Sequence, residues 1–105
     1  MYKQLEYYLK KRASFDNESL SYICKHFKKV TTKRNEVLCS IRQTCKHFYF
    51  INKGCLRMYE IDNKGNEVTG YFALEDSIMS AITSFVLQKP SRDFLVSHEP
   101  SELLA

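Results

Sequence analysis

The segment FYFINKGCLRMY, residues 48–59, carries the strongest structural signal in this sequence. Aromatic and branched residues fill both of its halves, which is typical of half-buried β-strands. Between the halves, Asn52-Lys53-Gly54 predicts a turn. A second turn, Asp62-Asn63-Lys64-Gly65-Asn66, follows the segment, and its Gly65 is able to adopt the positive φ that hairpin loops require. The return strand covers residues 67–72, so the centre of the chain is predicted to be antiparallel β-structure.

The chain after the central hairpin is less regular. Residues 94–96 and 102–104 are predicted to be strands from their apolar content. Residues 77–87 fit either extended structure or a single helical turn, because some of their apolar residues keep helical spacing. Pro90 is expected to end the element that residues 77–87 form.

Two amphipathic helices are predicted before the first strand. Residues 2–12 place apolar side chains at helical spacing, and Asp16 is a suitable N-cap for a second helix, because its carboxylate can accept backbone N–H groups of the first turn. Lys28 and Lys29 are expected near the negative end of that second helix dipole. After residue 29 the apolar period changes from helical spacing to alternation.

These elements predict a mainly β fold with N-terminal helices, in the manner of a sandwich or jelly roll. We divide the chain into a helical lead-in, residues 1–29, and a β domain, residues 30–105. The chain stops within the apolar run Leu103-Leu104-Ala105, so we expect the β domain to be truncated at its C-terminus. No internal repeat or low-complexity linker is present in the sequence.

The composition fits one globular domain of 105 residues. A hydrophobic content of 44%, with seven Phe and seven Tyr, is too apolar for a disordered chain. No apolar run approaches the roughly 18 residues that span a bilayer, so no membrane partner is expected. The N-terminal sequence MYKQLEYYLKKR has charges where an export signal needs an apolar stretch. We therefore expect a cytoplasmic protein.

The formal net charge of +4 is unevenly distributed, because thirteen of the sixteen Lys and Arg residues lie in residues 1–57. The basic residues of this half are expected either to lie on the solvated faces of the two helices or to contact nucleic acid or an acidic partner. The sequence lacks the interleaved aromatic and Arg residues of a single-strand binder and a helix-turn-helix pair.

The four cysteines show no metal-binding pattern. Their spacing contains no C-x-x-C pair and matches no common zinc or iron–sulfur motif. Without an export signal, two disulfides are not expected, and we predict reduced, mostly buried thiols. The cysteines are Cys24, Cys39, Cys45 and Cys55.

No catalytic motif is present, and we do not expect an enzyme. His26, His47 and His98 are isolated in the sequence, and there is no H-x-H, G-x-S-x-G, Walker or H-E-x-x-H pattern. Cys39 and Cys45 near His47 fit a nucleophile with its base or a redox sensor, or simply the packing of the aromatic strand that follows. No catalytic residue, metal or cofactor is assigned.

The central segment resembles the signature of the cyclic-nucleotide-binding domain. Residues 48–59 are similar to its "lyyIlkGxvrv" motif, and residues 62–68 are similar to the hairpin that follows in that family. The resemblance covers roughly residues 30–105 and is strongest to the Crp/Fnr regulators. Their divergent Bacteroidetes-type members are favoured by Ser84-Phe85 and by residues 89–92. The resemblance implies a double-stranded β-helix, or jelly roll, of the cyclic-nucleotide-binding type.

The family binds its ligand with a short phosphate-binding cassette. This cassette opens with Gly-Glu and closes with Arg-Ser or Arg-Thr, so that Glu bonds the ribose hydroxyl and Arg neutralises the cyclic phosphate. An ungapped register places Ser80 at the Gly, Ala81 at the Glu and Ser91 at the Arg. Arg92 is one position late, and in an extended segment it faces the opposite side. The resemblance therefore implies a degenerate cassette.

The pocket candidates are the residues that the register places around the cassette. A cyclic nucleotide is a candidate ligand that the altered cassette argues against, and the effector is either an unidentified small molecule or absent. Nearby, Glu75 and Asp76 are expected to cap the following helical turn, and Arg42 stands where the family has a glycine. The candidates are Tyr71, Ser80, Ala81, Ser84, Ser91 and Arg92.

The resemblance implies the effector-sensing domain of a Crp/Fnr-like transcription regulator. DNA would be bound only through a C-terminal helix-turn-helix domain, preceded by a dimerisation helix, and neither lies within these residues. The alternative is a stand-alone β-roll interaction module. A roll that ends at Leu104 would leave a strand edge unpaired, and exposed edges recruit partner strands. Self-association is therefore expected.

Overall fold

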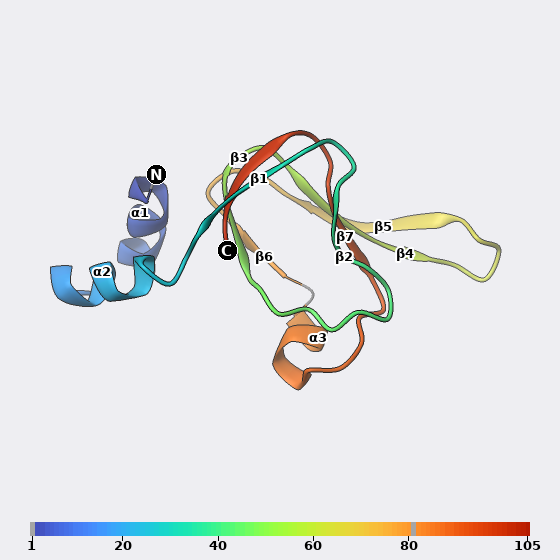
Figure 1. Ribbon diagram of the computed structural model, residues 1–105, viewed down its shortest axis with the longest axis horizontal. Coiled ribbons are helices and arrows are strands. Elements are labelled where there is room, and N and C mark those ends of the chain that lie inside the picture. The colour runs from blue at the N-terminus through green and yellow to red at the C-terminus, as the bar shows by residue number, and fades with distance from the viewer. Residues whose placement is uncertain (1, 81) are drawn as a thin grey trace.

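The computed structural model describes residues 2–80 and 82–105. Two helices stand at one end of two antiparallel sheets, and a third short helix lies along their side (Figure 1). The helices are α1 (Lys3–Arg12), α2 (Asn17–Cys24) and α3 (Ile82–Leu87). The strands are β1 (Lys29–Thr32), β2 (Val37–Cys39), β3 (Tyr49–Lys53), β4 (Leu56–Ile61), β5 (Glu67–Ala73), β6 (Ile78–Met79), β7 (Phe94–Ser97) and β8 (Ser101–Leu104).

The strands form two four-stranded sheets with the orders β1-β8-β3-β6 and β2-β7-β4-β5. Successive strands often change sheet, as in a jelly roll. The core between the sheets is apolar, because inward-facing residues alternate along the strands. Its most buried members, each at most 1% exposed, are Ile51, Leu56, Met79, Leu95 and Leu103. The mainly β fold with N-terminal helices is thus confirmed.

The β4–β5 hairpin is the one predicted from the central segment. Its pairing runs from Leu56 opposite Ala73 to Ile61 opposite Glu67. In the loop, the Asp62 carboxylate accepts backbone N–H groups of the two residues Lys64 and Asn66, at 2.8 and 2.9 Å. Gly65 has a φ of 82°, as the turn requires. The hairpin tip extends away from the sheets, at the end opposite α1 and α2 (Figure 1).

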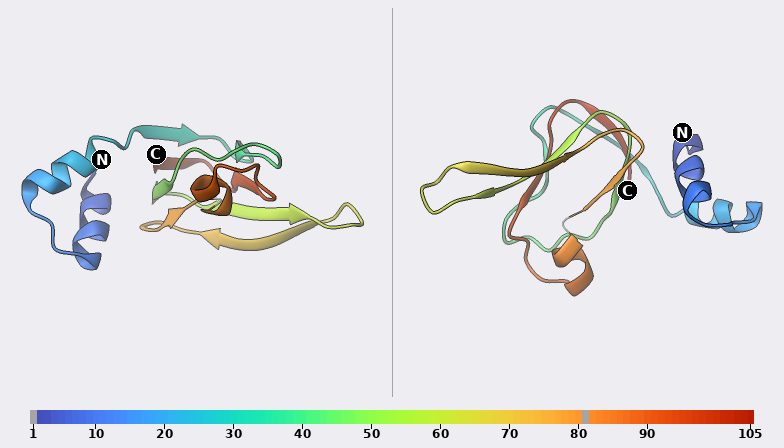
Figure 2. Two further views of the ribbon diagram at one scale, coloured as in Figure 1. Left: turned by 90° about the horizontal axis from the view of Figure 1, so that it is seen from below. Right: turned by 180° about the vertical axis from the view of Figure 1, so that it is seen from behind.

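The two N-terminal helices pack against the sheet that contains β3 and β8 (Figure 2). Leu5 of α1, Phe50 of β3 and Leu104 of β8 are each fully buried in one cluster. The Tyr8 ring meets the Phe50 ring edge-on, with 5.5 Å between centroids. Gln4 adds a polar anchor, since its Nε2 donates to the Asp76 carboxylate at 2.7 Å.

The predicted cap of α2 is present, but the helix ends earlier than predicted. Asp16 Oδ1 accepts the Ser19 N–H at 2.7 Å, and this bond lowers the pKa of the Asp16 carboxyl. The helix ends at Cys24 with no basic residue in its last turn, so the expectation that Lys28 and Lys29 lie at the negative end of its dipole is wrong. Lys29 pairs instead with Leu104 of β8, and the Lys28 backbone exchanges hydrogen bonds with Ala105, the residue after β8.

The last strand is not an edge. β8 lies between β1 and β3, and Leu104 pairs with Lys29 on one side and Phe50 on the other. The expectation of an unpaired edge at Leu104 is therefore wrong, because β1 returns along the outer side of β8.

Among residues 2–80 and 82–105, no helix has the length and apolar character needed to cross a membrane.

Candidate ligand-binding site

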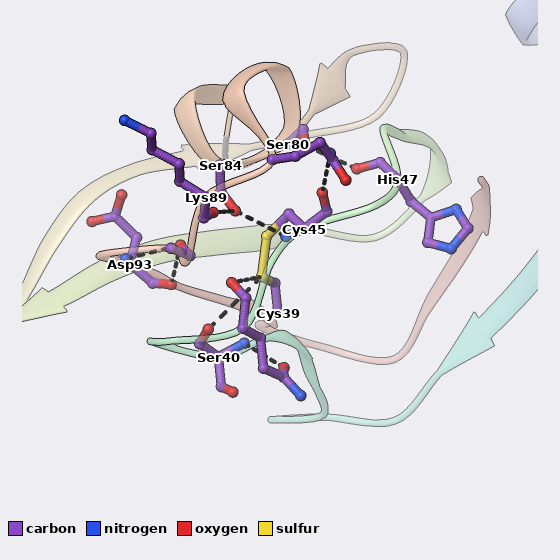
Figure 3. Close-up of a disulfide and its surroundings, with 11 residues drawn as sticks. Cys39, Ser40, Cys45, His47, Ser80, Ser84, Lys89 and Asp93 are labelled. Carbon is purple, nitrogen blue, oxygen red and sulfur yellow. Dashed lines mark hydrogen bonds between the residues drawn. A yellow bond between two sulfur atoms is a disulfide. The ribbon is translucent and has the colours of Figure 1, made fainter.

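The cassette position lies where β6 leads into α3 and the chain returns towards β7. This segment faces the loop between β2 and β3, residues 40–48, as Figure 3 shows around Ser80, Ser84 and Cys45. The two segments are joined by an isolated bridge between Thr44 and Pro90. The candidate site is therefore built from two loops that bond to each other.

The hydroxyls of Ser80 and Ser84 are buried and satisfied by backbone groups. Ser80 is 1% exposed, and its Oγ donates to the His47 carbonyl at 2.8 Å. Ser84 is 4% exposed, and its Oγ accepts the Cys45 N–H at 2.9 Å and donates to the Lys89 carbonyl at 2.5 Å. Buried hydroxyls need such partners, so these two serines hold the loops together.

Ser91, which the ungapped register aligned with the cassette arginine, bonds within the local turn. Its side chain is buried, and its Oγ donates to the Asp93 carbonyl at 2.8 Å and accepts the Asp93 N–H at 3.1 Å. Arg92, the next residue, is exposed to solvent. The cationic residues of this segment, Lys89 and Arg92, are thus both exposed, while Ser91 between them presents a small, buried hydroxyl.

Two of the six candidates lie partly or wholly outside the described part of the structure. Ala81 is not described, and Tyr71 is described only by its place in β5 opposite Met58. The structure brings Ser80 and Ser84 to one loop contact.

A disulfide between Cys39 and Cys45 corrects the prediction that all four thiols are reduced. The two Cα atoms are 6.0 Å apart, and the bond closes the loop after β2. Cys24 and Cys55 are free and buried, and burial raises the pKa of both thiols. The sequence analysis missed this pair, in which Cys39 ends a strand and Cys45 follows a short loop that turns back towards Cys39.

The disulfide loop is hydrogen-bonded to the cassette segment along its backbone. The Arg42 N–H donates to the Ser91 carbonyl at 2.9 Å, and the Ser91 N–H donates to the Gln43 carbonyl at 2.8 Å. Beside the loop lies an open cleft of about 450 Å³, lined in part by both cysteines, Lys46 and His47. Tyr49 also lines it, and burial raises the pKa of its phenol, which keeps the hydroxyl neutral.

Arg42 has a backbone conformation that favours glycine. Its φ is 76°, in the left-handed region. We expect Arg42→Gly to raise the free energy of unfolding by about 0.5–1 kcal/mol, because relief of roughly 1–2 kcal/mol of strain exceeds the entropic cost of glycine. Urea denaturation measures this. Arg34→Gly, at an exposed residue without a positive φ, is the control and should not be stabilising; equal gains in both variants would contradict the strain argument.

Glu75 and Asp76 do not cap α3, which corrects that prediction. Glu75 Oε1 accepts the Gly54 N–H at 3.2 Å, and Asp76 accepts from Gln4. The reason is that β6 separates both residues from α3, so they face the β3–β4 turn and α1 instead.

Among residues 2–80 and 82–105, no cluster of three or more His, Cys, Asp or Glu residues could hold a metal ion.

Solved structures with the same fold are cyclic-nucleotide-binding domains and transcription regulators. A cyclic nucleotide-binding domain from Methylobacillus flagellatus matches with a TM-score of 0.84 at 15% identity, over 98% of this chain and 59% of that one. The sensor domain of the transcriptional regulator DNR from Pseudomonas aeruginosa matches with a TM-score of 0.76 at 15% identity, over 99% and 73%.

The Thermus thermophilus Catabolite Activator Protein matches with a TM-score of 0.75 at 15% identity, over 87% of this chain. This chain spans only 42% of that protein. No family model and no curated protein matches the sequence. At these identities the likeness establishes the fold, which is the β-roll of cyclic-nucleotide-binding domains.

Proposed function

We propose that this chain is the effector-sensing domain of a Crp/Fnr-like transcription regulator of the Bacteroidetes type, and that its cassette does not bind cyclic AMP in the usual way. The observation that carries the second part is the position of Ser91. It is buried and bonded to Asp93, at the place where the cassette needs a cation. Support for the first part is the fold, which it shares with a catabolite activator and a sensor domain.

The physical argument is the cost of an unpaired phosphate charge. A cyclic phosphate that enters a buried site loses its hydration and needs a cation or several N–H donors in return. The Arg92 side chain is exposed, and the hydroxyls of Ser80 and Ser84 already donate to carbonyls. The two serines would have to break existing bonds before their hydroxyls could donate to the nucleotide.

The proposed partners follow from this function. In the cytoplasm, an unidentified small-molecule effector, or none, would occupy the roll, and no metal or cofactor would take part. A second copy of the chain would complete a dimer. DNA would be bound by a separate domain. Effector binding would change the position of that domain relative to the roll by favouring one of two conformational states.

Ligand binding is tested by thermal unfolding with cyclic AMP and cyclic GMP. We expect the melting temperature to change by less than about 1 °C at millimolar nucleotide, since only a ligand that binds the native state stabilises it. Adenosine 5′-monophosphate controls for non-specific effects, and a domain of this fold that binds cyclic AMP is the positive control. A saturable shift of several degrees with a cyclic nucleotide alone would overturn the degenerate cassette.

The regulator itself is tested on the protein from its own cells. Intact mass and peptide mapping should reveal a chain that continues beyond Ala105 into a long amphipathic helix and a helix-turn-helix. A native chain that ends near Ala105 would overturn DNA binding in this manner and would favour an interaction module.

A further inference from the structure

We propose that the Cys39–Cys45 disulfide is a redox modification site, whose co-reactant is a dithiol reductant and whose state controls the mobility of the cassette segment, residues 84–91. The disulfide closes the loop that bonds to this segment. The regulatory meaning rests on the proposed sensing function, whereas the redox chemistry stands without it.

The disulfide lies at the wall of a cleft from which a reductant can reach it once the loop opens. Both cysteines line the open cleft of about 450 Å³, together with Lys46 and His47. Lys46 directly follows Cys45 in the chain, and a cation near a cysteine stabilises its thiolate, which then leaves faster in disulfide exchange. Both cysteines are about 95% buried, so local opening of the loop at the cleft precedes attack.

The exchange proceeds in two balanced steps. A thiolate of the dithiol attacks one sulfur, the Cys39–Cys45 S–S bond breaks, and the released cysteine thiolate takes a proton. The second thiol of the reductant loses its proton and attacks the mixed disulfide, which frees the other cysteine. The protein gains two electrons and two protons, and the reductant gives up the same and becomes a disulfide. In the cytoplasm, disulfides are mostly of this exchangeable kind.

The loop contacts transmit the redox state to the cassette segment. The Cys45 N–H donates to Ser84 Oγ, and that hydroxyl donates to the Lys89 carbonyl, so one cysteine backbone is part of the bonding of α3 and the turn after it. On the other side of the loop, Arg42 and Gln43 hold both backbone groups of Ser91. The disulfide restrains this loop in a conformation in which Arg42 has a positive φ. Reduction removes the restraint.

The first experiment counts thiols in the whole chain. The protein is incubated in native buffer with oxidised glutathione or with dithiothreitol, quenched in acid, unfolded, alkylated and weighed. We expect two alkylated cysteines, Cys24 and Cys55, after oxidation and all four after dithiothreitol without denaturant. Four reactive thiols after oxidation would overturn the proposal. Reduction only in urea would also overturn it, because it would identify a purely structural disulfide.

The second experiment measures amide hydrogen exchange in both redox states. We expect exchange at residues 40–45 and 84–91 to rise at least about tenfold on reduction, with little change in α1 and in the β4–β5 hairpin. The Cys39→Ser/Cys45→Ser variant should match the reduced protein and ignore dithiothreitol. The matched Cys24→Ala/Cys55→Ala variant should keep the response.

Two outcomes separate this inference from the proposed function. Equal exchange at residues 84–91 in oxidised and reduced wild-type protein would overturn the coupling, whatever the ligand and even if a variant fails to fold. Thiol counts and exchange are measured without any nucleotide. Binding of cyclic AMP would therefore overturn the degenerate cassette and leave the redox site intact.

Discussion

Gly54→Ala is expected to lower the free energy of unfolding by roughly 2–6 kcal/mol, from strain of about 1–3 and overpacking of about 1–3 kcal/mol. The φ of Gly54 is 113°, which side chains rarely adopt. A Cβ there would lie 2.0 Å from Ser101 Oγ and 2.9 Å from the Ser101 Cα. Ser101 has little freedom to move, because its hydroxyl accepts the Cys55 N–H and donates to the Glu99 carbonyl.

Gly65→Ala is the matched control for this prediction. Gly65 also has a positive φ, 82°, but nothing lies within 4 Å of the Cβ that alanine would add. This variant carries backbone strain alone and should cost about 1–2 kcal/mol. Urea denaturation of both variants separates the two causes. A Gly54→Ala loss no greater than that of Gly65→Ala would show that the contact with Ser101 is relaxed at little cost.

Phe50→Ala is expected to cost about 3–5 kcal/mol, as is typical when a buried aromatic side chain is truncated. Phe50 is fully buried where α1 meets the sheet, against Leu5 and Leu104, and its ring contacts the Tyr8 ring edge-on. The cavity would open on the helix side, so α1 should lose its protection against amide exchange before the central hairpin does. Denaturation measures the loss of stability, and hydrogen exchange measures its location.

Phe72→Ala controls for the loss of an aromatic strand residue. Phe72 lies in β5 and is 49% exposed, with its ring against His98. Its truncation should change the stability by less than about 1 kcal/mol, since exposed positions away from the core contribute little. Similar losses for Phe50→Ala and Phe72→Ala would contradict the docking of α1 through Phe50.

The central hairpin and the cap of α2 were predictable because their causes are local. Asp62 and Gly65 form the β4–β5 turn through bonds and dihedrals within five residues, and Asp16 caps the helix that follows it directly. Alternation of apolar residues also indicated the core strands. The similarity to a family signature extended this reading to the β-roll, and the solved structures agree with it.

Contacts between distant segments were not predictable in the same way. Lys28 and Lys29 follow a helix in the sequence, but Lys29 begins β1 opposite Leu104 of β8, more than seventy residues later, and Lys28 bonds to Ala105. The same pairing places β8 inside its sheet. Glu75 was assigned to the next helix, whereas it bonds to Gly54 across the β3–β4 turn. A hydrogen-bond partner this far away leaves no mark in the local pattern.

The same difference between local and distant contacts applies to the candidate site. The sequence alone predicted the cassette segment and the replacement of its arginine by Ser91, because a register counted from a similar motif needs no coordinates, and this register stays a prediction. Folding determined the rest: Ser84 bonds to Cys45, and Cys39 and Cys45 meet as a disulfide. Spacing cannot establish whether two cysteines lie about 6 Å apart and aligned for a bond. That geometry arises only when the β2–β3 loop folds back so that Cys45 meets Cys39.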